Sequence, residues 1–324
     1  MNIIRDMELR KYINAALDRS WSIGPVTYED MELLTELDLG YSGVDTVEGL
    51  EYAINLKKLD LSGNNIEDIS PLKQLKKLEY LNLEENKISD ISAIRDLKKL
   101  KSLNLEYNNV EDISALNGLT SLRELKISDS KIKDVSIIGT LANLNCLVMY
   151  EVGIQDVSFV KNLKQLKQLD LSHNEISDIS FIEDLKFLKT LNLSKNRIKD
   201  ISLLKDFYDL EYLDLYNNEI EDISYLANLV DLRFINIRSN KVKDISALNQ
   251  LKSINNFFMS MQKVYIENFK EVKVQDVNSN IIEFDFMNNS KNILNKNILN
   301  NEIILATFKS PKNDFGGEVM LSLK

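Results

Sequence analysis

The chain has 324 residues, of which 44% are hydrophobic, and its formal net charge at pH 7 is −10. This length allows one large domain or two ordinary ones, and the acidic balance argues against a nucleic-acid partner, because phosphate contacts need clustered lysine and arginine. The single cysteine, Cys146, excludes an internal disulfide and a thiolate metal cluster.

Residues 1–33 are predicted to form a helical N-terminal cap. The apolar spacing of one helix face is carried by Leu9, Tyr12, Ile13, Ala16 and Leu17. The sequence Thr27-Tyr28-Glu29-Asp30 is typical of a helix start, with Asp where Glu or Gln is usual.

The same N-terminal segment bears on localisation. Charges interrupt its first twenty residues, so it lacks the apolar region of a signal peptide. No window of the chain reaches the ~18 apolar residues that a membrane span needs. We therefore expect a cytoplasmic protein if the chain is full length, and a secreted or cell-surface protein if it is a trimmed mature form.

Internal repetition predicts the fold of residues 34–264, about eleven turns of 22 residues. The pattern LxxLxLxxN recurs at this interval. The turns begin at Leu34, Leu56, Leu78, Leu100, Leu122, Leu144, Leu166, Leu188, Leu210, Leu232 and, in a degraded form, Ile254. Nine turns also carry an Asp-Ile/Val-Ser triplet, and the recurrence of its Asp in turn after turn indicates a structural role in the bends.

One turn shows why the repeat folds as a stack. Leu81 and Leu83 alternate as in a short strand. The apolar residues that follow, Ile88, Ile91, Ile94 and Leu97, recur every third residue, as 3₁₀-like turns require. A single turn cannot bury this set, but stacked turns merge it into one continuous core with a parallel sheet.

A column of asparagines is predicted to support the bend after each strand, because an amide side chain can bond backbone groups there. Its members are Asn64, Asn86, Asn108, Asn174, Asn196, Asn218 and Asn240.

This pattern resembles the leucine-rich repeat, and the 22-residue length with DIS triplets is similar to the bacterial internalins. The resemblance implies an α/β leucine-rich repeat solenoid, with a parallel β-sheet on the concave face, 3₁₀ turns or loops on the convex face, and the helical cap at residues 1–33. It also implies a small all-β immunoglobulin-like domain over residues 265–324. Strand-like segments lie at residues 272–274, 281–286, 302–308 and 318–323. The alternative is that these strands merely cap the solenoid.

Catalytic, metal and cofactor sites are not expected. The only histidine, His173, is at the eighth position of its turn and Cys146 at the third, roughly 16 Å apart along the strand direction at ~3.3 Å per residue. No phosphate-binding glycine loop or nucleophile motif is present. Glu84, Glu85 and Glu106 lie on neighbouring turns, where a solvated acidic patch is favoured over a hard-cation site.

The third, fifth and seventh positions of each turn should point to the concave face, with the eighth just beyond it. Tyrosine, phenylalanine and arginine there are the types that anchor interfaces. The candidate protein-binding residues are Tyr80, Glu84, Glu106, Tyr107, Cys146, Val148, Tyr150, Tyr212, Tyr216, Phe234 and Arg238. For Phe234 the alternative is that the C-terminal domain covers it.

The turn from Leu144 departs from the repeat. Ser130 and Val152 replace the column asparagine in two consecutive turns, and Cys146, Val148 and Tyr150 form an apolar strip between polar neighbours. An apolar centre with a polar rim is typical of a binding surface. Drift in a redundant repeat would produce the same pattern.

The sequence thus predicts a monomeric, non-enzymatic protein-binding module. The family resemblance implies a surface or secreted protein that meets a host or another cell-surface molecule. Two alternatives are a cytoplasmic scaffold or regulatory subunit that holds a partner enzyme, and a structural spacer without a specific ligand.

Overall fold

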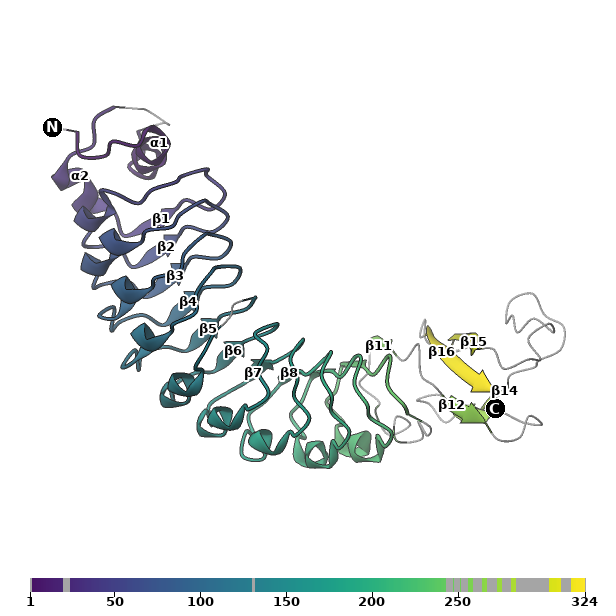
Figure 1. The fold of residues 1–324 in the computed structure, drawn as a ribbon. Helices are drawn as coiled ribbons and strands as arrows, with labels where there is room; N and C mark the ends of the chain where they lie inside the picture. The colour runs from purple at the N-terminus through teal and green to yellow at the C-terminus, as the bar shows by residue number, and fades with distance from the viewer. Residues whose placement is uncertain are drawn as a thin grey trace. The chain divides into compact units, whose positions relative to one another are not determined.

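The structure is a computed structural model that describes residues 2–19, 24–129, 132–242, 247 and 251, together with six short strands between residues 256 and 323. The chain divides into two compact units. The first consists of Met1–Gly153 and Ser158–Leu166, and the second of Ile154–Val157 and Lys167–Lys324. Figure 1 shows the elements in chain order.

The N-terminal cap contains two helices, α1 (Met7–Ala16) and α2 (Tyr28–Leu33). The predicted helix start is confirmed, because Thr27 and Asp30 form a capping box in which each side chain bonds the other's backbone N–H. The predicted apolar face of α1 is narrower than expected. Leu9 is buried, but Ala16 is exposed and lines a groove instead of the core.

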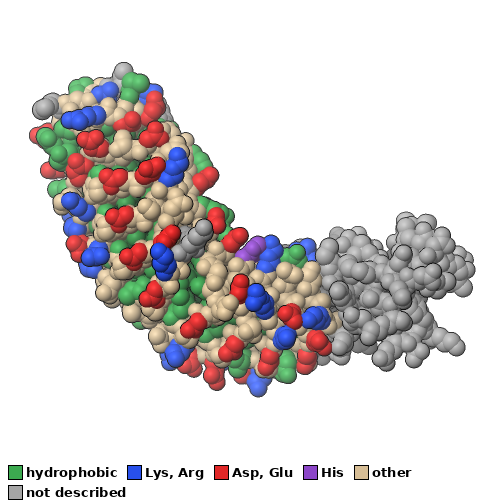
Figure 2. All heavy atoms as spheres, in the orientation of Figure 1, with side chains coloured by type: hydrophobic (Ala, Val, Ile, Leu, Met, Phe, Trp, Pro, Cys, Tyr) green, Lys and Arg blue, Asp and Glu red, His purple; other side chains and the backbone are tan. Residues whose placement is uncertain are grey.

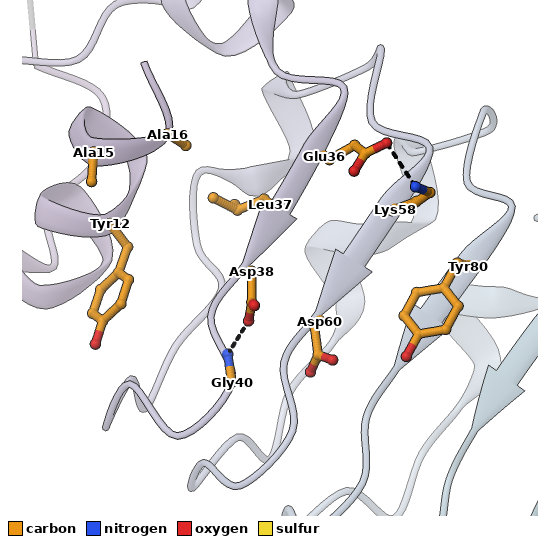
Figure 3. Close-up of a pocket in the computed structure, with 10 residues that line it drawn as sticks. All are labelled: Tyr12, Ala15, Ala16, Glu36, Leu37, Asp38, Gly40, Lys58, Asp60 and Tyr80. Carbon is orange, nitrogen blue, oxygen red and sulfur yellow. Dashed lines mark hydrogen bonds and ion pairs between the residues drawn. The ribbon is translucent and has the colours of Figure 1, made fainter. Parts of the chain in front are cut away.

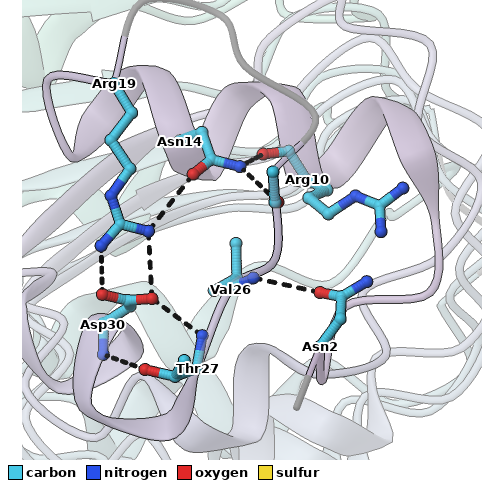
Figure 4. A network of polar contacts seen from close by, with 8 residues as sticks. Asn2, Arg10, Asn14, Arg19, Val26, Thr27 and Asp30 are labelled. Carbon is cyan, nitrogen blue, oxygen red and sulfur yellow. Dashed lines mark hydrogen bonds and ion pairs between the residues drawn. The ribbon is translucent and has the colours of Figure 1, made fainter.

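A polar network holds the two cap helices together (Figure 4). The buried side chain of Asn14 donates to the carbonyl oxygens of Arg10 and Gly24. The Arg19 guanidinium bonds both carboxylate oxygens of Asp30. This hydrogen bond holds the pKa of Asp30 below its ordinary value. The loop between the helices is thus fixed at both of its ends.

In the first unit the repeat forms six short parallel strands, paired in chain order from β1 to β6. They are β1 (Glu36–Asp38), β2 (Lys58–Asp60), β3 (Tyr80–Asn82), β4 (Ser102–Asn104), β5 (Glu124–Lys126) and β6 (Cys146–Val148). The 3₁₀ turns of this unit are η1 (Leu50–Tyr52), η2 (Ser70–Gln74), η3 (Ser92–Ile94), η4 (Ser114–Leu116), η5 (Ser136–Thr140) and η6 (Ser158–Asn162).

The second unit continues the same pattern. Its strands are β7 (Gln168–Asp170), β8 (Thr190–Asn192), β9 (Tyr212–Asp214), β10 (Phe234–Asn236) and β11 (Asn256–Phe258), again parallel and paired in order. Its 3₁₀ turns are η7 (Ser180–Ile182), η8 (Ser202–Asp206) and η9 (Ser224–Asn228). The eleven strands from β1 to β11 each begin 22 residues after the last, so the predicted repeat length and strand positions are confirmed.

Each turn contributes the same side chains to the core. In the third turn Leu78, Leu81, Leu83, Ile88, Ile94 and Leu97 are all fully buried, and Ile91 is 1% exposed. Burial of one leucine or isoleucine side chain stabilises a fold by about 1.5–3 kcal/mol, so the stacking of turns is the main source of stability.

Each asparagine of the column follows its strand in the sequence, at the bend after the strand. Asn86 donates to the carbonyl oxygens of Leu61, Leu83 and Glu84 and accepts from the N–H of Ile66. Asn64, Asn108, Asn196, Asn218 and Asn240 repeat all four bonds, and Asn174 repeats three of them. Each amide therefore joins its own turn to the preceding one. Val152, which takes the asparagine's place in the sixth turn, is buried, whereas Ser130 lies outside the described residues.

The aspartates of the DIS triplets act locally in the bends. In seven turns the carboxylate accepts the N–H of the serine two residues later, at 2.7–2.9 Å. In these seven turns the bond closes the bend that leads into the 3₁₀ turn, which agrees with the expected structural role of the aspartates.

Beyond β11 the structure describes five strands, β12 (Val264–Ile266), β13 (Lys273–Gln275), β14 (Ile281–Glu283), β15 (Ile303–Lys309) and β16 (Gly316–Leu323). β16 pairs with β15 antiparallel and with β12 parallel, and β13 pairs with β14 antiparallel. Strands thus lie within or beside all four predicted segments. The rest of residues 265–324 lies outside the described residues, and the immunoglobulin-like topology stays a prediction.

Candidate functional site

The side chains that follow most strands are positioned by a polar column that was not predicted from the sequence. At the fifth position of eight turns, an Asp or Asn oxygen accepts the N–H of the residue two places later. These residues are Asp38, Asp60, Asn82, Asn104, Asp170, Asn192, Asp214 and Asn236. The bond ends each strand and fixes where the seventh side chain begins.

The same column also joins neighbouring turns. Asn82 Nδ2 donates to Asp60 Oδ2 at 3.0 Å, and Asn236 Nδ2 donates to Asp214 Oδ2 at 3.1 Å. Lys126 and Val148 interrupt the column in the last two strands of the first unit. The sequence does contain this column, because an Asp or Asn recurs every 22 residues directly after a core leucine.

In the first unit the candidates Tyr80 and Tyr107 are exposed. Glu84 is half-buried, and its Oε2 accepts from Asn104 Nδ2 at 2.9 Å. Glu106 is only 9% exposed, so it presents little charge to a partner. Burial raises the pKa of Tyr80, and the nearby charges of Asp60 and Glu124 raise it further.

The irregular strip is less exposed than its sequence indicates. Cys146 is half-exposed, while Val148 is 9% exposed. Tyr150 packs edge-on against Tyr107, with 6.1 Å between ring centroids. Burial raises the pKa of Tyr150, and a hydrogen bond with Tyr107 adds to the effect. Tyr107 and Tyr150 therefore form one ordered aromatic pair, although they belong to turns two apart.

The second unit brings its four candidates together in pairs. The rings of Tyr212 and Phe234 stack with centroids 4.1 Å apart and planes 4° from parallel. Arg238 lies over the ring of Tyr216, with its guanidinium carbon 5.2 Å from the centroid, and its Nε donates to Asn236 Oδ1. All four side chains are half-buried. Each member of a pair holds the other's orientation, which lowers the entropy lost when a partner binds.

A half-buried acid, Asp214, lies between Tyr212 and Tyr216 in the sequence. Burial raises the pKa of Asp214, against the opposing bonds from the Tyr216 N–H and the Asn236 side chain. Its charge is thus already engaged by the protein, and the aromatic rings and Arg238 remain as the groups that can contact a ligand.

Other surfaces carry a mixture of charges. Figure 2 shows acidic and basic side chains interspersed over the visible side of the described residues. Many are paired between equivalent positions of neighbouring turns, such as Lys189 with Glu211 at 2.8 Å. Exposed pairs of this kind contribute little to stability. Within the described residues, no group of three or more His, Cys, Asp or Glu side chains is arranged to hold a metal ion.

A groove at the N-terminal end of the first unit was also not predicted. It is formed between α1 and strands β1–β3 and has a volume of about 640 Å³ (Figure 3).

Two further exposed aromatics, Phe187 and Tyr208, lie in the loops that lead into the strands of the second unit. Among the described helices, none is long and apolar enough to cross a bilayer.

Comparisons with known proteins agree with this architecture. The family described as "Leucine Rich repeats (2 copies)" matches residues 54–98, 98–143, 164–206, 186–228 and 208–250. An internalin (InlF) of Listeria monocytogenes is 34% identical, with a TM-score of 0.71, over 82% of this chain and 85% of that chain. An internalin C2 of the same species is 30% identical, with a TM-score of 0.56, over 72% and 94%.

A more distant structure shares the fold alone. It is the leucine-rich repeat ectodomain of an Arabidopsis thaliana membrane receptor kinase, in complex with CASPARIAN STRIP INTEGRITY FACTOR 2, at 21% identity and a TM-score of 0.60 over 71% of this chain and 33% of that one. No curated protein sequence matches the chain. On the repeat matches and the two Listeria structures, this chain belongs to the leucine-rich repeat family and is an internalin-like member of it.

Proposed function

We propose that this protein binds another protein through its concave face and that it is a surface or host-interaction protein of the internalin type. Leucine-rich repeat proteins generally act in protein–protein binding and are typically non-enzymatic. The 34% identity to an internalin supports the host-interaction type.

The observation that carries the proposal is the set of ordered aromatic pairs at the positions that we assign to the concave face. Tyr212 stacks on Phe234, and Arg238 covers Tyr216. In the first unit Tyr107 packs on Tyr150. Tyrosine, phenylalanine and arginine that are held in place before binding lose little side-chain entropy in a complex, and such residues dominate interface energies.

Two double variants test the face, one for each unit. Tyr107→Ala with Tyr150→Ala removes the pair of the first unit, and Tyr216→Ala with Phe234→Ala removes one member of each pair of the second. The control is Phe187→Ala with Tyr208→Ala, because these side chains are 56% and 54% exposed but lie outside the concave positions. Circular dichroism checks that all three variants fold.

The native protein and the three variants are used to capture partners from the producing cell's own lysate and from a host-cell extract. The proposal predicts one partner that the native protein and the control retain and that at least one concave-face variant loses. Equal capture by every form would contradict it. A partner found only in the producing cell's own lysate would support the scaffold alternative instead of the host-interaction type.

A further inference from the structure

The groove between the cap and the first strands is large enough to admit a side chain of a ligand. Three residues of α1 form one wall, and β1, β2 and β3 form the other. Its volume of about 640 Å³ falls in the ~300–1,000 Å³ range of clefts that enclose small ligands. All the residues that line it belong to the first unit.

Small residues keep this groove open. Ala15 and Ala16 of α1 line it beside Tyr12, and Gly40 occupies a seventh position that in later turns carries Ser, Glu, Tyr or Arg. A Cβ atom at Gly40 would lie 3.2 Å from Ser62 Oγ and 3.3 Å from Asp38 Oδ1. Any larger side chain there would therefore narrow the groove beside its carboxylates.

The charge of the groove is negative. Lys58 is its only cation, and Lys58 Nζ is paired with Glu36 Oε1 at 2.8 Å. Asp38 and Asp60 are register partners on adjacent strands, and neither is paired with a cation among the described residues. Asp38 uses Oδ1 for the N–H of Gly40, while Asp60 bonds Ser62 and Asn82. Carboxylates have about four acceptor sites, so both can accept further donors.

Aromatic rings complete the site. Figure 3 shows Tyr12 and Tyr80 on opposite sides of the two aspartates. A cation between tyrosine rings is attracted by their π-faces, and the aliphatic stem of a long side chain can lie against apolar surface such as Ala15 and Leu37.

We propose that this groove binds one basic side chain, arginine or lysine, of the protein partner, with Asp38 and Asp60 bonding its charged head and Tyr12 and Tyr80 flanking it. This inference rests on the proposed function in one respect only, namely that the basic side chain belongs to a protein partner. The groove lies apart from the aromatic pairs used to test the concave face, so either idea can fail alone.

Small probes test the groove directly in the intact protein. N-acetyl-arginine amide and N-acetyl-lysine amide carry the charge, and N-acetyl-citrulline amide is a neutral analogue of the arginine probe. Each is titrated while NMR follows the backbone amide of Gly40, which bonds Asp38, and the side-chain amide of Asn82, which bonds Asp60. The proposal predicts saturable shifts with at least one charged probe and none with citrulline.

Two matched variants distinguish a loss of binding in the groove from a general effect on the fold of the repeat. Asp60 and Asp170 make the same bonds, each accepting from the serine two residues later and from the asparagine 22 residues later. Asp60→Asn and Asp170→Asn therefore disturb the fold alike, but only Asp60 lines the groove. The Asp60→Asn substitution should weaken probe binding about tenfold, the effect of one charge-assisted hydrogen bond, and Asp170→Asn should leave it unchanged.

A second variant, Asp38→Asn, tests the groove if the Asp60→Asn protein does not fold. Asp38→Asn keeps an oxygen for the Gly40 N–H, and asparagine already occupies this position in the third and fourth turns. It should also weaken binding. Equal shifts with citrulline, no shift with either charged probe, or native affinity in a folded Asp38→Asn or Asp60→Asn protein would overturn the proposal.

Discussion

At the residue scale, buried asparagines and positive-φ positions define each turn. Asn108 is 6% exposed and bonds four backbone groups in three segments, Ile88, Leu83 and Leu105–Glu106. No other residue type offers two donors and an acceptor in so compact a side chain. The asparagine column thus serves backbone groups that water cannot reach.

Replacing Asn108 with alanine should destabilise the protein by about 3 kcal/mol, because several buried backbone groups lose their partner at once. The neighbouring Asn109 is exposed, so Asn109→Ala should stay within about 0.5 kcal/mol of the native protein. Chemical denaturation followed by circular dichroism measures both. Similar losses in the two variants would contradict this account of the column.

The eighth position of each turn adopts a left-handed conformation, from Tyr41 through Ser239. Gly63 is the glycine of this column, at φ +64°, and a Cβ atom there would overlap the ring of Tyr41. Tyr41 extends across Gly63 to Glu85, where its hydroxyl donates to Oε2 at 3.0 Å. The glycine thus makes room for a side chain that links three successive turns.

This contact predicts a difference between two glycines of similar φ. Gly43→Ala, at φ +73° with no neighbour within 4 Å, should cost only the backbone strain of about 1 kcal/mol. Gly63→Ala should cost about 1 kcal/mol more, because the Tyr41 ring must move and lose its bond to Glu85. In a Tyr41→Ala background the excess should vanish. An excess that persists there would show that the ring is not its cause.

At the element scale, strand and 3₁₀ positions could be predicted because the 22-residue period repeats the same burial pattern in every turn. The N-terminal cap lies outside the repeat, so its contacts could not be predicted from the 22-residue period. Ala16 fits the apolar spacing of α1, yet it faces the groove. The groove itself needs residues from α1 and from three strands, and the Tyr107–Tyr150 pair crosses two turns. Long-range neighbours of this kind leave no mark in local sequence.

The cap depends on Asp30, which closes the capping box of α2 and binds Arg19 of the preceding loop. Asp30→Ala should lower the stability of the cap by about 2 kcal/mol, since both interactions are lost together. Glu32→Ala in the same helix is the control, because that side chain is exposed. Hydrogen exchange of residues 26–34 reports the change, and unaltered protection in Asp30→Ala would refute the role.

The same residue makes the cap sensitive to acid. The bond from Arg19 lowers the folded-state pKa of Asp30 from its ordinary value of 3.8. A lowered pKa stabilises the fold fully above the unfolded value, and this contribution is lost as the pH falls through the folded value. Exchange of residues 26–34 should therefore rise below about pH 4 in the native protein, and Asp30→Ala should lack that rise.

At the scale of the whole molecule, most turns share the same two polar columns, and a few irregular turns lack them. Both polar columns are interrupted near the end of the first unit, at Lys126, Val148 and Val152. A turn without these bonds is held mainly by its apolar core. In the irregular strip Val148 is buried, whereas Cys146 and Tyr150 are half-exposed and Tyr150 is paired with Tyr107; its role as a binding patch stays a prediction.

Protein binding through the concave face is tested most directly by hydroxyl-radical footprinting of the protein with and without its captured partner. The account predicts that Tyr107, Tyr216 and Phe234 lose reactivity in the complex. Phe187 and Tyr208, which are exposed outside the concave positions, should react as in the free protein. Protection of Phe187 and Tyr208 with unchanged reactivity at the three concave-face residues would contradict the central claim.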